Sequence, residues 1–208
     1  MQVVPSEKEK TEKIDVQFEL EKEIIDILLN FSWDEHTFEN SYIDLDDRGT
    51  KTEKVKNDWK ICEYIYVNLQ EDEIEFINED FRKIYDTIIE SYLQGEKVDI
   101  NLLFKDSSSD IVNMLSSMMV KYDEERIHNW EKMQIYPKSI KADIPRKTEA
   151  CVTRLRYFLL QKLIDDLVID ISEKSDSEKR EILMLIDDYN KLKIDMATFL
   201  GGSLPQKI

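Results

Sequence analysis

The chain has 208 residues and a formal net charge of −16, with 41% hydrophobic and 36% charged residues. This length allows one sizeable core or two small ones, and the negative charge disfavours direct binding to nucleic acid, which requires Lys and Arg to neutralise phosphates. Only four Gly and four Pro are present, which disfavours sandwiches and barrels with their closely spaced turns and predicts long helices in an all-α fold.

Two cysteines, Cys62 and Cys151, lie far apart in the sequence and form no Cys-x-x-Cys motif. Isolated cysteines of this kind indicate neither a disulfide framework nor a zinc site, so we expect buried, reduced thiols and a cytoplasmic protein. The longest apolar runs are far shorter than the roughly 20 residues of a membrane-spanning helix. We therefore expect no membrane segment and no membrane partner.

The N-terminal part begins with residues 1–16, which mix Glu and Lys around Pro5 and predict a flexible linker or tail. A broad apolar face then predicts a helix over residues 16–31. Residues 32–53 interleave aromatic and acidic side chains. This pattern favours a loop, with a short β-hairpin turning at residues 47–49 as the alternative.

The middle of the chain has the apolar spacing of helices. A second helix is predicted over residues 55–69 and a third over 78–94, with Asn78 as its N-cap and Gly95 closing it. The polar residues 107–110 predict the start of a further helix.

A short helix is expected over residues 125–133, and Pro145 is expected to separate this helical part from the C-terminal residues. The predicted division is a tail at 1–16, a helical bundle subdomain at 17–145, a C-terminal helical hairpin subdomain at 146–202 and a tail at 203–208.

The C-terminal part carries the clearest pattern. Apolar residues recur at spacings of three and four in two stretches, which a short polar segment, residues 172–177, separates. Such spacing places one apolar stripe along each of two helices, and Ser175 with Glu178 forms a capping box for the second. These features predict a long antiparallel helical hairpin in which Leu160 faces Leu192. The seam residues are Tyr157, Leu160, Ile164, Leu167, Ile171, Ile182, Leu185, Tyr189, Leu192, Met196 and Phe199.

Further apolar residues on the hairpin cannot all lie on its single seam. They must pack on the bundle, on a second copy or on a partner, and apolar patches on a highly charged surface usually mark contact sites. The candidate partner-binding residues are Leu159, Leu163, Val168, Leu183, Ile186 and Ile194.

Catalytic and metal-binding motifs are incomplete. A di-iron bundle needs two Glu-x-x-His motifs, but the only one runs from Glu125 to His128, and Trp33 stands where the Glu before His36 belongs. Residues 44–49 resemble the start of a calcium loop, yet its fifth position is an arginine and its twelfth lacks the required Glu. No glycine-rich phosphate loop occurs. We therefore predict no catalytic residue, metal or cofactor.

Short apolar and turn patterns carry a family resemblance. They are residues 21–30, Glu63-Tyr64-Ile65, Glu75-Phe76, residues 80–85, Ile135-Tyr136 and Phe199-Leu200-Gly201. With these patterns, about residues 18–202 resemble the C-terminal helicase-binding domain of bacterial DnaG-type DNA primases, in a larger variant with an insert after the first helix. The ending from Gly202 onward departs from that family's short basic and apolar ending.

The resemblance implies a non-catalytic module that docks on the N-terminal domains of the hexameric, DnaB-type replicative helicase. There it would tether primase to the fork and modulate helicase activity and primer synthesis. The alternative is a structural or regulatory coiled-coil protein that self-associates through the hairpin. A di-metal enzyme stands third.

Overall fold

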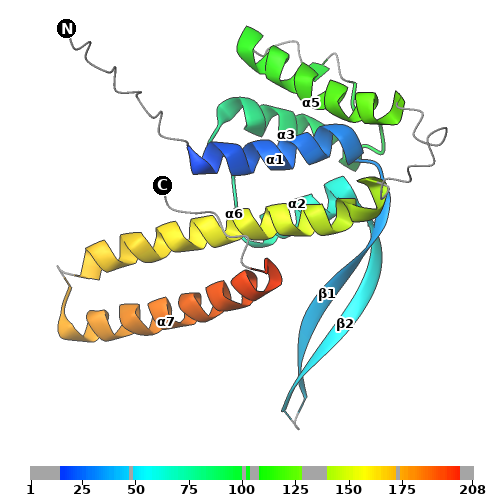
Figure 1. Cartoon of the computed structure of the whole chain (residues 1–208). Coiled ribbons are helices and arrows are strands. Elements are labelled where there is room, and N and C mark those ends of the chain that lie inside the picture. The colour runs from blue at the N-terminus through cyan, green and yellow to red at the C-terminus, as the bar shows by residue number, and fades with distance from the viewer. Residues whose placement is uncertain are drawn as a thin grey trace, which may run out of the picture.

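The computed structural model of the chain is mostly helical and contains one antiparallel two-stranded sheet (Figure 1). It describes residues 15–46, 49–99, 102–103, 108–127, 140–171 and 174–201, and within residues 40–55 and 121–142 it describes the backbone only. The prediction of a purely all-α fold is therefore wrong, because the segment after the first helix forms strands. The elements are α1 (Val16–Phe31), β1 (Glu35–Asp46), β2 (Gly49–Lys60), α2 (Ile61–Glu71), α3 (Glu79–Leu93), α5 (Ser109–Ile127), α6 (Ile140–Asp170) and α7 (Asp176–Phe199).

Helix α1 is the centre of the core and begins where the sequence predicts. The carboxylate of Asp15 caps it by accepting hydrogen bonds from the backbone N–H of Gln17 and Phe18, at 3.1 and 3.2 Å. The helix contacts α2, α3, α5 and α6, and Figure 1 shows it between α5 and α6. Four of its apolar side chains are completely buried, namely Ile24, Ile25, Ile27 and Leu28.

A β-hairpin occupies the segment for which the sequence suggests a loop or a short hairpin, and its second strand takes the place of the start of a predicted helix. Its strands pair from Glu35 opposite Lys60 to Asp46 opposite Gly49, so the predicted turn at 47–49 falls mainly on two residues outside the described ones. Phe38 is fully buried and stacks on Tyr64 of α2 at 4.1 Å. Residues 55–60 form a strand because they pair with β1, with Phe38 opposite Asn57, although their apolar spacing also fits a helix.

Helix α2 therefore begins at Ile61 and not at residue 55. Its first backbone N–H groups donate to the segment between α1 and β1: Ile61 N bonds to the carbonyl of Asp34 and Cys62 N to that of Ser32, both at 3.1 Å. These bonds satisfy helix N–H groups that have no partner within the helix. Away from these hydrogen bonds, the β-hairpin extends outward from the helices (Figure 1).

Helix α3 confirms the predicted cap and end. The side chain of Asn78 accepts hydrogen bonds from Asp80 N and Phe81 N at 3.1 and 3.0 Å. Gly95 follows the helix with φ of +75°, a conformation that glycine adopts without steric penalty. The buried carboxylate of Glu21 in α1 accepts from Ile77 N and Asn78 N at 2.9 and 3.1 Å, and so joins the two helices.

Pro145 does not separate two elements, because α6 runs through it from Ile140 to Asp170. The first half of α6 belongs to the core, where Ile144, Thr148 and Leu155 are at most 1% exposed. Tertiary packing on both sides of the proline thus overrides its usual effect on a helix. The predicted short helix at 125–133 begins as the last turn of α5, and residues 128–139 lie outside the described ones. The division into subdomains stays a prediction.

Candidate partner-binding site

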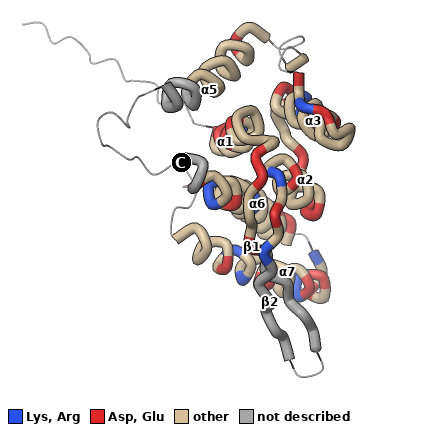
Figure 2. Tube along the Cα trace, turned by 90° about the vertical axis from the view of Figure 1, so that its right-hand side faces the viewer, with Lys and Arg blue, Asp and Glu red and all other residues tan. Residues whose placement is uncertain are grey.

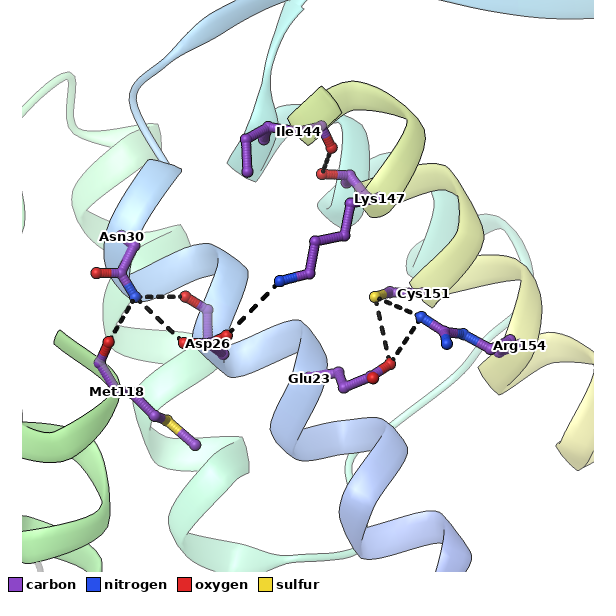
Figure 3. Close-up of polar contacts among 9 residues, drawn as sticks. Glu23, Asp26, Asn30, Met118, Ile144, Lys147, Cys151 and Arg154 are labelled. Atoms are coloured by element: carbon purple, nitrogen blue, oxygen red, sulfur yellow. Dashed lines mark hydrogen bonds and ion pairs between the residues drawn. The ribbon is translucent and has the colours of Figure 1, made fainter. Parts of the chain in front are cut away.

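Helix α6 is held to α1 by polar contacts that run along its first half (Figure 3). The guanidinium of Arg154 contacts the Glu23 carboxylate at 2.9 Å and the sulfur of Cys151 at 3.2 Å. Nearer the start of α6, the ammonium of Lys147 lies 3.9 Å from the carboxylate of Asp26. These contacts fix the direction in which α6 leaves the core.

A second set of polar contacts joins α6 to the end of α2. Arg156 donates to the side-chain and backbone oxygens of Asn68 at 3.0 and 2.8 Å, and its Nε donates to the carboxylate of Asp72. The planar guanidinium suits this multiple recognition because its donors point in fixed directions. Beyond Arg156, the second half of α6 extends past α1 and lies alongside α7 (Figure 1).

Helix α7 lies alongside α6 and has no buried residue over its 24 positions. Ile182, Tyr189 and Met196 of the predicted seam are half-buried. The alternate seam residues are open to solvent, with Leu185 40% exposed and both Leu192 and Phe199 51% exposed. Helix α7 therefore turns only one edge of its apolar stripe toward α6.

Lys193 occupies the place that the sequence predicts for Leu192. Its ammonium lies 5.0 Å from the centre of the Tyr157 ring and bonds to the side-chain oxygen of Gln161, both on α6. These contacts fall within one helical turn of the predicted pairing of Leu160 with Leu192. The rotation that brings Lys193 inward is favoured because its aliphatic stem can cover apolar surface while its charge meets an aromatic face.

The six predicted partner-binding residues divide by exposure. Leu159 is half-buried and packs against the core, so the bundle already covers it. Ile186 is half-buried on α7. The other four are exposed: Leu163 by 43%, Val168 by 53%, Leu183 by 55% and Ile194 by 64%.

Five further apolar residues of α6 and α7 are exposed although the sequence does not predict them as partner-binding residues. Ile169 and Met184 are 71% and 70% exposed, and Leu185, Leu192 and Phe199 join them. The sequence places the last three on the seam, because a period of 3.5 residues does not reveal which edge of a stripe meets the neighbouring helix. The signals in the sequence for that rotation are Ile186 and Lys193, which are half-buried where the seam predicts Leu185 and Leu192.

Charges on the outer side of α7 pair along the helix. The Lys191 ammonium lies 2.8 Å from the Asp187 carboxylate and 3.0 Å from that of Asp188, and hydrogen bonds to these two groups raise its pKa. At the start of the helix, Glu178 accepts from the backbone N–H of Ser175 at 2.9 Å and from its hydroxyl. These bonds lower the pKa of Glu178. Figure 2 shows acidic residues on α1, α2, α3 and α7.

A hollow of about 640 Å³ lies between the starts of α1 and α3 and the side of α6. Three of its polar side chains are engaged in the fold, because Asp15 and Asn78 cap helices and Glu21 accepts from backbone N–H groups. The two thiols elsewhere are poor nucleophiles, since burial raises the pKa of Cys62 to about 11 and that of Cys151 to about 12. Among the described residues, no group of three or more His, Cys, Asp or Glu is placed to hold a metal ion.

Comparison with known proteins assigns the chain to a family. The matching family is described as a domain of unknown function, DUF8430, and its match covers residues 6–203. The chain belongs to this family. Searches of curated proteins and of solved structures found no match. Within the described part of the chain, each helix is too short or too polar to cross a membrane.

Proposed function

We propose that this chain is a non-catalytic protein-interaction module. Residues 146–202 form a helical hairpin that docks on the N-terminal domains of a DnaB-type replicative helicase in the cytoplasm, and residues 17–145 support the hairpin. As the interaction part of a DNA primase, the module would tether primase to the fork and modulate helicase activity and primer synthesis. It needs no cofactor, and it binds neither nucleic acid nor membrane directly.

One observation carries the interaction role. Helix α7 has an apolar stripe but no buried residue, although α1 in the same chain is packed into a full core. Exposed apolar surface of this kind on a charged protein usually marks a contact site. The identity of the partner rests on the resemblance to primase helicase-binding domains.

The test is a calorimetric titration of the whole chain into the isolated N-terminal domain of a DnaB-type helicase. Leu183→Glu and Leu192→Glu change the two exposed flanks of α7, and at least one of them should weaken binding by about tenfold or more, because it places a charge in an apolar contact. The control is Leu93→Glu, which adds the same charge at a 63% exposed residue of α3. The proposal would be contradicted if neither the unmodified chain nor the control bound the helicase domain. It would also be contradicted if both α7 variants bound the domain as tightly as the unmodified chain.

A second candidate function is self-association through the hairpin, favoured by the same exposed residues on α7. It predicts a concentration-dependent rise in mass during analytical ultracentrifugation, which Leu192→Glu should abolish. Weak self-association alone is compatible with both functions. A pull-down with the helicase N-terminal domain separates them, since a purely self-associating protein would not retain it.

A further inference from the structure

One flank of α7 combines an apolar row with an acidic row. Leu185, Leu192 and Phe199 follow one another at intervals of seven residues and are 40%, 51% and 51% exposed. Because seven residues are close to two helical turns, the three side chains lie in a line along the helix. Together with the half-buried Tyr189 and Met196, they alternate at spacings of four and three, the pattern by which one helix packs against another.

The acidic row has the same interval. Glu181, Asp188 and Asp195 each precede a residue of the apolar row by four positions, and all three are exposed. Asp188 also pairs with the ammonium of Lys191 at 3.0 Å on the solvent side of the helix. Residues four apart are neighbours on a helix surface, so each acid borders the next apolar side chain. In coiled coils, charged residues beside the apolar positions select the partner helix by its opposite charge.

We propose that this flank receives an amphipathic α-helix of the partner, with apolar residues at a spacing averaging about 3.5 and Lys or Arg along the edge beside the acidic row. This inference rests on the proposed function and names the face of the hairpin and the kind of segment that binds it. Complementary charge would speed encounter and fix the register of the two helices.

A second copy of the chain fits this flank poorly. It would bring an identical row of Glu181, Asp188 and Asp195 against the first, and like charges at such positions oppose pairing. The opposite flank is also less suited to a helix. Its exposed residues Leu183 and Ile194 are separated by the polar Asp187 and Asn190, each four positions from one of them.

The first arm of the test uses two designed helical peptides of about three heptads with the same leucine stripe, one edged with Lys and one with Glu. Fluorescence titration of the whole chain should show about fivefold to tenfold tighter binding of the Lys-edged peptide at low salt, the sum expected of two or three exposed ion pairs, since Asp188 is shared with Lys191. The preference should vanish near 1 M salt, where charges are screened within about 3 Å. Equal affinity for both peptides at low salt would overturn the proposal.

The second arm separates site-specific pairing from the general attraction of an acidic protein. The triple change Glu181→Lys, Asp188→Lys and Asp195→Lys should reverse the preference, so that the Glu-edged peptide binds more tightly. The matched control changes three exposed acids elsewhere, Glu71→Lys, Glu90→Lys and Glu96→Lys, with the same gain in net charge. Equal effects of the two triple variants would mean that net charge alone attracts the peptide, and would overturn the proposal.

The third arm tests the apolar row and distinguishes this inference from the proposed function. Leu185→Glu and Leu192→Glu should each weaken binding of the Lys-edged peptide and of the helicase N-terminal domain by about tenfold, while Leu93→Glu changes neither. If only Leu183→Glu and Ile194→Glu weakened helicase binding, the docking role would stand and this flank would be rejected. If the unmodified chain bound the Lys-edged peptide but not the helicase domain, the named partner would be wrong and the flank would stand.

Discussion

Helices α1 and α7 have opposite relations to the rest of the molecule. Ile24, Ile25 and Ile27 of α1 are completely buried, and α1 contacts four other helices, whereas α7 has no buried residue and lies mainly against α6. Burial of one such side chain stabilises a fold by about 1.5–3 kcal/mol. The apolar residues of α1 therefore contribute to stability, while half of those on α7 remain available for binding.

Thiol labelling should give the largest contrast between the two regions. Cys62 and Cys151 are buried, with pKa values raised to about 11 and about 12, so thiolate is scarce at neutral pH and reagents reach the sulfur only after local opening. In the variant Leu192→Cys, the new thiol on α7 should react with Ellman's reagent on the order of 10³ times faster than the native pair, as expected for sites that need no opening. Similar rates at all three positions would contradict the burial contrast.

Truncation should separate the regions by stability. Ile24→Ala removes most of a fully buried side chain and should lower the free energy of unfolding by about 2–5 kcal/mol. Leu192→Ala, at a 51% exposed position, should change it by about 0.5 kcal/mol or less. Urea denaturation followed by circular dichroism measures both. A comparable loss in the two variants would mean that α7 is a structural part of the core.

Loss of the Glu21 carboxylate should cost less than the core truncation. Glu21 is 1% exposed and accepts from Ile77 N, Asn78 N and the side-chain amide of Gln17. Glu21→Ala leaves these donors without that partner and should lower stability by about 1–3 kcal/mol. The control is Glu19→Ala, whose exposed carboxylate pairs with Lys22 on the same helix and should contribute within about 1 kcal/mol. Equal losses of stability in the two variants, measured by urea denaturation, would contradict this role of Glu21.

The smallest effect concerns the first turn of α7. Hydrogen bonds from Ser175 lower the pKa of Glu178, so its ionised form stabilises the helix above the usual value of 4.5, and that contribution is lost as the pH falls through the lowered pKa. Helicity of α7 should therefore decrease slightly on acidification. Backbone NMR shifts of residues 176–180 should report this change, and Ser175→Ala should reduce its amplitude. A rise in α7 helicity over the same pH range would be the wrong sign.

Local capping residues explain why the ends of α3 can be predicted from the sequence. Asn78 and Gly95 define the ends of α3 through a side-chain bond and a left-handed turn, both of which depend on a few adjacent residues. The start of α2 could not be found in this way, because it depends on the distant carbonyls of Ser32 and Asp34. The predicted break at Pro145 is wrong for the same reason, because packing against residues far along the chain keeps α6 continuous.

The sequence predicts the two helices that carry the candidate site, but not their rotation relative to one another. Spacings of three and four residues give two striped helices, yet they do not determine which edge of the α7 stripe meets α6. That choice is made by Lys193, which contacts Tyr157 and Gln161 and leaves Leu192 outside. The sequence of α7 alone does not determine this rotation, because the groups that Lys193 contacts lie on a separate helix.

Amide hydrogen exchange, measured on the whole chain with and without the helicase N-terminal domain, tests the central claim most directly. We predict that in the free chain the amides of α7 exchange much faster than those of α1, and that the added domain slows α7 exchange while leaving α1 unchanged. If α7 were already as protected as α1 in the free chain, or if the added domain left its exchange unaltered, the role of α7 as a docking surface for this partner would be contradicted.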